Sequence, residues 1–121
     1  MLKWFSKKDV HLDPKDFSVL HTDMHSHLIP SIDDGSQCLD ESLELILALN
    51  DLGFSKIITT PHTMSDFYKN TPEIINNGKE EVKKVLKKLN INVEFEASSE
   101  YYVDFDFQQK INIGEFLTFG S

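Results

Sequence analysis

The residues best suited to chemistry in this sequence are histidines and carboxylates that recur at short intervals. Asp23, His25 and His27 are spaced by two, so in an extended strand their side chains lie on the same side. Imidazole and carboxylate groups without thiolates suit Mn, Fe or Zn rather than copper(I) or an iron–sulfur cluster. Taken alone, the short pattern fits two solvent-facing histidines on an edge strand equally well.

Further candidate ligands follow at three places along the chain. An acidic pair, Asp33 and Asp34, precedes a glycine; His62 follows Pro61; and Glu100 follows an alternating apolar segment. Taken separately, these features indicate a plain turn, a structural histidine and a solvated charge. A carboxylate such as Glu100 can bridge two divalent ions, which activate water and stabilise the leaving oxygen of a phosphoester. The joint placement therefore predicts a metal site, since chance explains it poorly.

The apolar pattern predicts the elements that must position these side chains. Period-two and apolar runs indicate strands, and spacings of three and four residues indicate helices. Strands are expected over 18–25, 54–60 and 91–97, helices over 39–52 and 71–89, and a loop with a short helix over 98–112. This order predicts an α/β fold of parallel strands with helical crossovers. The candidate ligands would then meet at the carboxyl ends of the strands.

Several other residues are expected to be structural. His11 and His21 are assigned to structure or surface, and Cys38 is expected to be a small buried residue at a helix start. The tyrosines are expected to pack rather than to catalyse: Tyr68, Tyr101 and Tyr102. The lysines of the second helix are expected to form a solvated face: Lys79, Lys83, Lys84, Lys87 and Lys88. The buried faces of the two helices are expected to be Leu43, Ile46, Leu47 and Asn50, and Val82, Val85, Leu86 and Leu89.

The charge balance excludes some partners. The chain has 20 acidic and 12 basic residues and a net charge of −8, which argues against a nucleic-acid partner. All the basic residues are lysines, so the bidentate arginine clamp for phosphate is missing. Any anion site must therefore use a metal ion, lysine or backbone N–H groups.

The amino-acid pattern also bears on cellular location. The sequence has no apolar run of about 18 residues, so it is not expected to be embedded in a membrane. Its first ten residues, MLKWFSKKDV, lack the apolar stretch of a secretory signal. A single cysteine excludes a disulfide framework. The expectation is a cytoplasmic protein with a polar leader over residues 1–17.

Three stretches carry a family resemblance: TDMHSHLIPSIDDGS, LGFSKIITTPHTMSDFYKNTPE and EASSEYYVD. They resemble the PHP (polymerase and histidinol phosphatase) superfamily and, more narrowly, the bacterial tyrosine-protein phosphatases of capsule and exopolysaccharide synthesis. The resemblance runs from about Phe17 to the last residue. It implies a metal-dependent hydrolase on a distorted, TIM-like (β/α)7 barrel, typically using manganese, with iron or zinc as alternatives. The implied partners are phosphotyrosine proteins, notably the tyrosine kinases of polysaccharide export.

The same resemblance implies roles for individual residues. His25 and His27 would bind one ion, Glu100 would bridge ions, and His62 would bind a further ion. Asp34 is the preferred acidic ligand of the first loop, with Asp33 as the alternative. Asp23 would orient a histidine. The implied metal ligands are therefore His25, His27, Asp34, His62 and Glu100.

The chain also departs from the family pattern. That pattern continues with a further histidine and an Asp-x-His near the carboxyl end, and neither is present. The length of 121 residues is half of the ~250 typical of a complete parallel barrel. We therefore expect residues 18–121 to form the N-terminal half of the barrel, apparently truncated, with little or no activity alone.

Two alternatives remain open at this point. One is another phosphoesterase of the superfamily, such as histidinol phosphatase. The other is a non-catalytic fragment or interaction module, because an open barrel leaves a strand edge that invites self-association.

Overall fold

The computed structural model describes residues 15–120. The predicted polar leader lies outside the described residues as far as position 14, and His11 lies outside with it. The elements, in chain order, are η1 (Ser18–Leu20), β1 (Thr22–Asp23), α1 (Leu39–Asp51), β2 (Lys56–Thr59), β3 (His62–Thr63), α2 (Pro72–Lys88), β4 (Glu94–Ala97), β5 (Glu100–Tyr101) and α3 (Phe107–Ile113).

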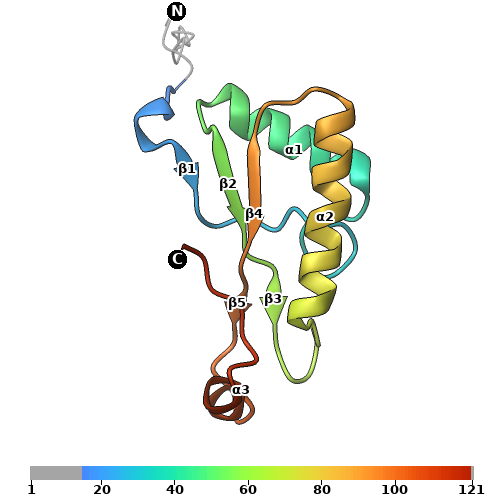
Figure 1. Ribbon diagram of the computed structural model, residues 1–121, viewed down its shortest axis with the longest axis vertical. Coiled ribbons are helices and arrows are strands. Elements are labelled where there is room, and N and C mark those ends of the chain that lie inside the picture. Colours follow the sequence, from blue (N-terminus) through green and yellow to red (C-terminus); the bar gives the residue numbers. More distant parts are fainter. Residues whose placement is uncertain (1–14, 121) are drawn as a thin grey trace, which may run out of the picture.

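The main sheet consists of three parallel strands in the order β1-β2-β4 (Figure 1). Helix α1 follows β1, and helix α2 lies between the β3 segment and β4. These crossovers confirm the predicted α/β fold with parallel strands. Both helices end within one residue of the predicted limits, and Thr71 caps α2 by accepting a hydrogen bond from the Ile74 N–H.

The core lies between the sheet and the two helices. Ile57 of β2 and Phe95 of β4 are paired in register and point to the same side of the sheet. Ile46 of α1 and Val82 of α2 cover them, and full burial of such a side chain stabilises the fold by about 1.5–3 kcal/mol. The buried cluster comprises Leu28, Ile46, Ile57, Val82, Leu86 and Phe95.

The first predicted strand, 18–25, is confirmed only at Thr22–Asp23. Ser18–Leu20 form a 3-10 turn, and Val19 is 80% exposed, so this apolar run does not enter the core. His21 closes the turn with a φ of 59°, after which only Thr22–Asp23 are extended. The third predicted strand is also shorter, since the Ile91 N–H donates to the Leu86 carbonyl and belongs to the end of α2.

The second predicted strand stops at residue 60, but strand pairing continues past Pro61. The Pro61 carbonyl accepts a hydrogen bond of 2.9 Å from the Glu100 N–H. Strands β3 and β5 then pair in parallel, with His62 opposite Glu100. This two-stranded sheet continues the course of β2 and β4 at the lower end of the molecule in Figure 1. It brings two candidate ligands side by side.

Two helix faces and one cysteine differ from the predictions. Leu47 is 43% exposed and Leu89 is 53% exposed, so neither belongs to a buried face. On α1 the inner position is taken by Ser42, which is fully buried and forms a 2.7 Å hydrogen bond with the Ser36 hydroxyl. Cys38 lies at the N-cap of α1 and is exposed rather than buried.

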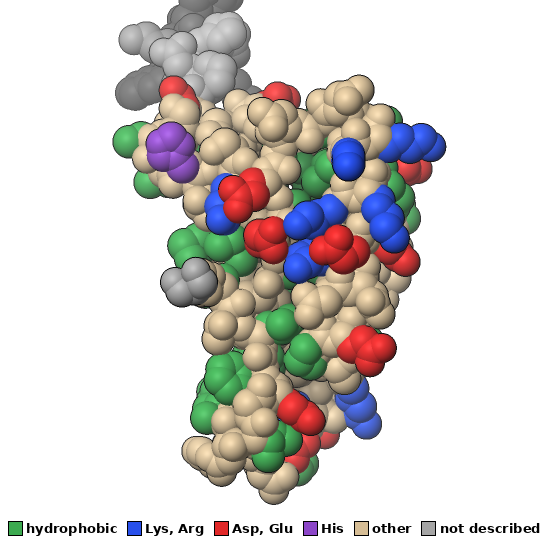
Figure 2. Space-filling view, in the orientation of Figure 1, with side chains coloured by type: hydrophobic (Ala, Val, Ile, Leu, Met, Phe, Trp, Pro, Cys, Tyr) green, Lys and Arg blue, Asp and Glu red, His purple; other side chains and the backbone are tan. Residues whose placement is uncertain are grey.

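The other face of the sheet carries charged side chains beside the buried Ile58. Lys56 of β2 forms a 2.6 Å ion pair with Glu94 of β4. Glu96, two residues further along β4, pairs with Lys83 and Lys79 of α2. Figure 2 shows these charges gathered over β4 and α2. The prediction that the lysines of α2 form a solvated face is wrong for Lys79, because its side chain is only 17% exposed.

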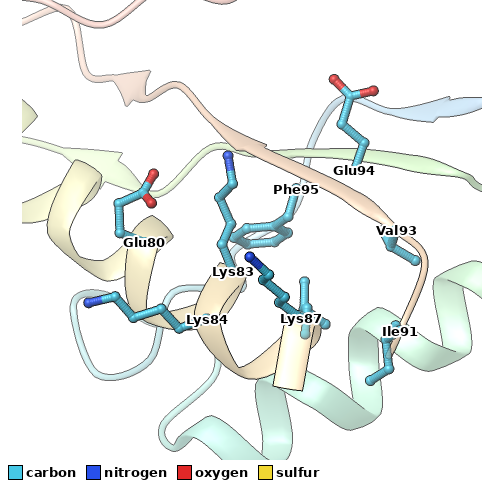
Figure 3. A pocket seen from close by; sticks show the side chains of 9 residues that line it. Glu80, Lys83, Lys84, Lys87, Ile91, Val93, Glu94 and Phe95 are labelled. Atoms are coloured by element: carbon cyan, nitrogen blue, oxygen red, sulfur yellow. The ribbon is translucent and has the colours of Figure 1, made fainter. Parts of the chain in front are cut away.

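Strand β4 is an edge strand within the part of the chain that the structure describes. Beside it lies an open groove of about 520 Å³ between α2 and the segment that enters β4 (Figure 3). Phe95 and Val93 contribute its apolar surface, and Lys83 and Lys87 flank it. Among residues 15–120, no helix is long and apolar enough to cross a membrane.

Candidate metal centre

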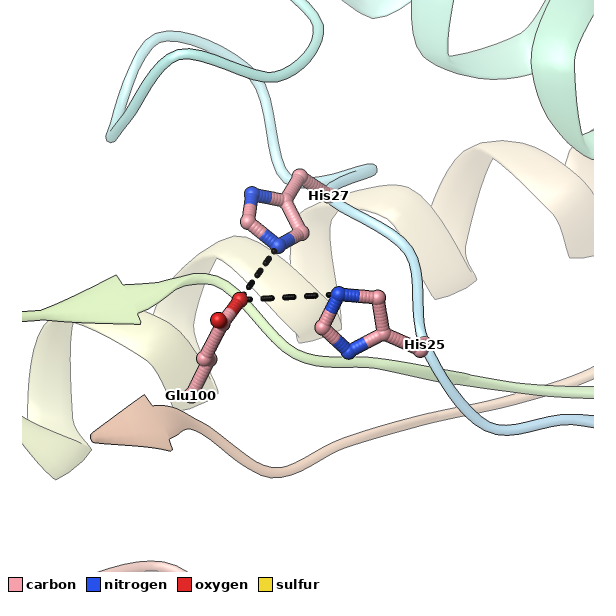
Figure 4. A group of neighbouring side chains, drawn as sticks. All are labelled: His25, His27 and Glu100. Carbon is pink, nitrogen blue, oxygen red and sulfur yellow. Dashed lines mark hydrogen bonds and ion pairs between the residues drawn. The ribbon is translucent and has the colours of Figure 1, made fainter. Parts of the chain in front are cut away.

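The candidate ligands meet beyond the carboxyl ends of the strands. Glu100 begins β5, and its Oε2 atom lies 3.2 Å from Nε2 of His27 and 3.5 Å from Nε2 of His25 (Figure 4). The ligand atoms of these three residues all lie within 4.8 Å of one another, as one metal ion requires. Two separate chain segments thus contribute to this first group.

A second group shares His27 with the first. Asp34 Oδ1 lies 3.4 Å from Nε2 of His62 and 3.4 Å from Nδ1 of His27. The rings of His27 and His62 meet edge to face, with centroids 4.5 Å apart. Glu100 Oε2 is also 3.5 Å from Nδ1 of His62, so this carboxylate oxygen adjoins all three imidazoles. The structure therefore brings all five sequence-predicted ligands together.

Asp33 has a different environment from its neighbour Asp34. Its side chain is fully buried, and Oδ2 lies 3.0 Å from Nδ1 of His27 while accepting a 2.9 Å hydrogen bond from the His62 N–H. Its Oδ1 atom accepts from the Gly35 N–H. Both oxygens are thus engaged by the protein, whereas the Asp34 side chain is 61% exposed. Asp34 is therefore the more accessible carboxylate of the pair.

The Asp33 contact also bears on the protonation of His27. When Nδ1 carries the proton and donates to a carboxylate, Nε2 presents its lone pair. Nε2 of His27 is the nitrogen that faces Glu100. Sequence reasoning missed this role for Asp33, although the Asp-Asp-Gly turn placed the residue in the correct loop.

The end of β2 holds the segment that carries the first two histidines. The buried Thr59 hydroxyl accepts from the Leu28 N–H at 2.9 Å and donates to the Ser26 carbonyl at 2.8 Å. The Thr60 N–H donates to the same carbonyl, and its hydroxyl lies 3.3 Å from Nδ1 of His25. Sequence reasoning did not single out these threonines; the signal was two hydroxyl residues at the end of an apolar strand.

Gly35 is required by a close approach to His27. A Cβ atom at this position would lie 2.3 Å from the His27 carbonyl oxygen and 2.4 Å from the His27 Cβ. Any side chain would therefore displace a candidate ligand. The Ser36 N–H donates to that same carbonyl at 3.1 Å, which fixes the turn against the strand end.

Two further residues that sequence reasoning did not assign to the site hold His62. The Tyr68 ring stacks on the His62 ring, with centroids 5.6 Å apart and an interplanar angle of 11°. Asn70 is buried, and its amide donates to the carbonyls of His62 and Ile32. The loop after β3 thus folds back on the imidazole and ties it to the first loop.

Asp23 and His21 are the two other polar residues of interest in the first predicted strand. Asp23 ends β1, and its Oδ2 atom is buried without a hydrogen-bond partner among the described residues. The orientation of a histidine by Asp23 stays a prediction. His21 is exposed, as expected for a surface histidine.

The donor set fits a divalent cation. Three imidazoles and the carboxylates of Asp33, Asp34 and Glu100 gather in a chain of net charge −8. Among the residues described, no lysine forms an ion pair with these carboxylates, whose partners are the three imidazoles. Nitrogen and oxygen ligands of this kind suit Mn, Fe or Zn.

Comparisons with known proteins find similar tyrosine-protein phosphatases. Tyrosine-protein phosphatase YwqE of Bacillus subtilis is 35% identical over 69 residues, which is 57% of this chain and 27% of the relative. Tyrosine-protein phosphatase CpsB of Streptococcus agalactiae is 28% identical over 96 residues, which is 79% of this chain and 40% of the relative. The chain therefore spans less than half the length of these relatives.

Solved structures lead to the same group. Crystal structures of YwqE from Bacillus subtilis and CpsB from Streptococcus pneumoniae, described as unique metal-dependent tyrosine phosphatases, include a match with a TM-score of 0.74. The match is 28% identical and covers 80% of this chain and 39% of that chain. These relatives are named tyrosine phosphatases, which does not favour the alternative of a histidinol phosphatase. Because the family of capsular polysaccharide synthesis, CpsB/CapC, matches residues 21–121, this chain belongs to the CpsB/CapC family.

Proposed function

We propose that this chain supplies the N-terminal part of a metal-dependent protein-tyrosine phosphatase that acts in capsule or exopolysaccharide regulation. One observation carries the proposal: a single oxygen of Glu100 lies within 3.5 Å of a ring nitrogen of each of His25, His27 and His62. Such an arrangement suits a carboxylate shared between ions. Membership of the CpsB/CapC family supports phosphotyrosine as the substrate.

In this proposal the five predicted ligands hold divalent ions, with manganese preferred and iron or zinc as alternatives. Bound ions would activate water and neutralise charge on the phosphate of a phosphomonoester. The residues of this chain have separate tasks. His25, His27 and Glu100 hold one ion, Asp34 and His62 contribute to a second, and Asp33 fixes the orientation of His27.

The fold is consistent with the N-terminal part of a distorted, TIM-like (β/α)7 PHP barrel. The helices cover one face of the sheet. The opposite face carries Lys56, Glu94 and Glu96, which in this proposal line a polar barrel interior. In this proposal residues 18–121 form one part of the barrel wall. Activity of the chain alone is then low, because its ligands approach the ions only from neighbouring strand ends.

The proposed partner is a phosphotyrosine protein, such as a bacterial tyrosine kinase of polysaccharide export, in the cytoplasm. A nucleic-acid partner does not fit the charge of −8. Self-association through the free edge of β4 is also proposed, because an unpaired edge offers N–H and C=O groups to another strand. Sedimentation of the purified chain would measure it, and a strictly monomeric chain would contradict it.

The function is tested by joining residues 18–121 to the remaining part of the YwqE relative. We expect the chimera to hydrolyse a phosphotyrosine peptide with Mn²⁺, and His25→Ala in the chimera to abolish turnover. A chimera that folds and binds Mn²⁺ but prefers histidinol phosphate would favour the histidinol phosphatase alternative. An isolated chain that binds no Mn²⁺ in calorimetry would favour the non-catalytic module.

A further inference from the structure

A cavity of about 370 Å³ lies directly beside the candidate metal centre, within the ~300–1,000 Å³ range of ligand pockets. Its wall has two chemically different parts. One part consists of the candidate ligands Asp34, His62 and Glu100. The other part is largely apolar and includes Met64, Tyr68 and Tyr102. The cavity therefore runs from metal-binding groups to aromatic rings.

Strand register explains why these residues share one cavity. His62 pairs with Glu100, and Thr63 pairs with Tyr101. Since side chains alternate along a strand, the next residues, Met64 and Tyr102, return to the face that carries the ligands. Tyr101 also lines the cavity, and its hydroxyl accepts a 2.6 Å hydrogen bond from the Leu117 N–H.

The apolar wall is fixed by the protein itself. The Met64 N–H donates to the Tyr68 carbonyl at 2.8 Å, which closes the loop over His62. The Tyr102 N–H donates to the Thr63 carbonyl at 3.0 Å. These bonds fix the backbone that carries Met64, Tyr68 and Tyr102 before any ligand arrives, and preorganised groups lose less entropy on binding.

The loop after β3 is also fastened to the segment after β5. Both the N–H and the hydroxyl of Ser65 donate to the Asp104 carboxylate, at 2.9 and 2.7 Å. These bonds lower the pKa of Asp104, which keeps it ionised and bonded at neutral pH. The two sides of the apolar wall are thereby joined next to the cavity.

We infer that this cavity is the subsite for the aromatic ring of the phosphorylated residue, with Met64, Tyr68 and Tyr102 as its walls. The inference rests on the proposed function, which places the phosphate at the metal centre. In phosphotyrosine a single oxygen joins the phosphorus to the ring, so a phosphate held by the ions leaves the ring in the adjoining space. An aliphatic phosphate leaves that space unfilled. The subsite thus favours aryl phosphates over alkyl phosphates.

The test compares phenyl phosphate with methyl phosphate on the zinc-loaded chain by NMR titration. We expect phenyl phosphate to bind about two- to tenfold more tightly, as one aromatic contact allows. Only phenyl phosphate should shift the methyl signal of Met64. Met24, which is 46% exposed and lies outside the cavity, is the internal control and should not move.

Two variants separate the subsite from general effects of surface aromatics. Tyr102→Ser should reduce the preference for phenyl phosphate to near unity and leave methyl phosphate binding unchanged. Phe67→Ser is the matched control, because Phe67 is 81% exposed on the same loop as Tyr68 and does not line the cavity. It should leave both affinities unchanged.

The outcomes distinguish this inference from the proposed function. Equal affinities for the two phosphates, or a preference that survives Tyr102→Ser, would overturn the ring subsite and leave the metal centre standing. A chain that takes up zinc but binds neither phosphate would refute phosphate binding and the ring subsite together. A chain that takes up no zinc in a parallel calorimetric titration would refute the metal centre on which both depend.

Discussion

Asp33 Oδ2 lies 3.0 Å from Nδ1 of His27, and this contact decides which nitrogen of His27 faces Glu100. Asp33 is buried and holds the His62 N–H with the same oxygen, so one carboxylate braces two candidate ligands from different strand ends. In the proposed function it would act on a metal ion through the histidine rather than by touching the ion.

The first prediction concerns the contacts of Asp33 with His27 and His62. Asp33→Asn should weaken Mn²⁺ binding by about 10–100-fold, the usual cost of losing a carboxylate behind a ligating histidine. Calorimetric titration measures the affinity, and circular dichroism confirms the fold. Asp66→Asn is the control, since Asp66 is exposed. Wild-type affinity in Asp33→Asn would show that the Asp33 carboxylate does not affect Mn²⁺ binding.

The second prediction separates the two ligand groups, which share His27. His25→Ala should lower the affinity of one Mn²⁺ site, and His62→Ala the affinity of the other. His27→Ala should weaken both sites, because His27 belongs to the first group and packs against Asp34 and His62 of the second. The number of ions bound and their affinities come from calorimetry, with the exposed His21→Asn as control. Identical effects of His25→Ala and His62→Ala would indicate a single site.

The third prediction concerns the contact between α2 and the first loop. A Cβ atom on Gly78 would lie 2.2 Å from Cγ2 of the buried Ile29. Gly78→Ala should therefore lower the free energy of unfolding, since overpacking costs about 1–3 kcal/mol and outweighs a helix-propensity gain of up to about 1 kcal/mol. Urea denaturation measures the change. Asn77→Ala on the exposed side of the helix should be neutral or stabilising, and a stabilised Gly78→Ala would contradict the close contact.

The fourth prediction is a pH dependence of stability. Burial raises the pKa of Glu96, but the hydrogen bonds and charges of Lys83 and Lys79 outweigh it, so the pKa lies below its ordinary value of 4.5. A lowered pKa in the folded state stabilises the protein above the unfolded value, and this contribution disappears as the pH falls through the folded value. The Glu96 side chain is 38% exposed, so the contribution should stay below about 1 kcal/mol.

Glu96→Gln should therefore be less stable than the natural chain at pH 7, and the difference should vanish in acid. Urea denaturation over a pH series measures it. Glu81→Gln, an exposed neighbour on α2, should show no such convergence. A difference that grows as the pH falls would give the opposite sign and refute the assignment.

Much of the fold could be predicted because local patterns and tertiary burial agree. The spacing of Leu43 and Ile46, and of Val82 and Leu86, predicts helices whose inner faces enter the core. The prediction failed where apolar residues stay exposed. Val19 and Leu20 read as strand residues, but nothing covers them within the described chain, and the backbone turns there instead.

The candidate ligands could be predicted from the sequence, but the contacts that hold them in place could not. Spacing by two placed His25 and His27 together, and the strand-end rule placed His62 and Glu100 beside them. The roles of Asp33, Thr59 and Tyr68 depend on contacts between segments about 30 or more residues apart, or on ring stacking, which no local pattern encodes. The pairing of β3 with β5 was missed for the same reason, because Pro61 reads locally as a break.

The ligands come from separate strand ends, and this joins ion uptake to folding. Ions held by the two ligand groups would crosslink the segments that carry His27, His62 and Glu100, which have no such link in the unfolded chain. Thermodynamic linkage then adds RT ln(1 + [ion]/Kd) to the free energy of unfolding, about 2.7 kcal/mol at a hundred times Kd. The midpoint of thermal unfolding should therefore rise with Mn²⁺ concentration and fall back on chelation. For this chain the stability of the folded state thus depends on the concentration of free ion.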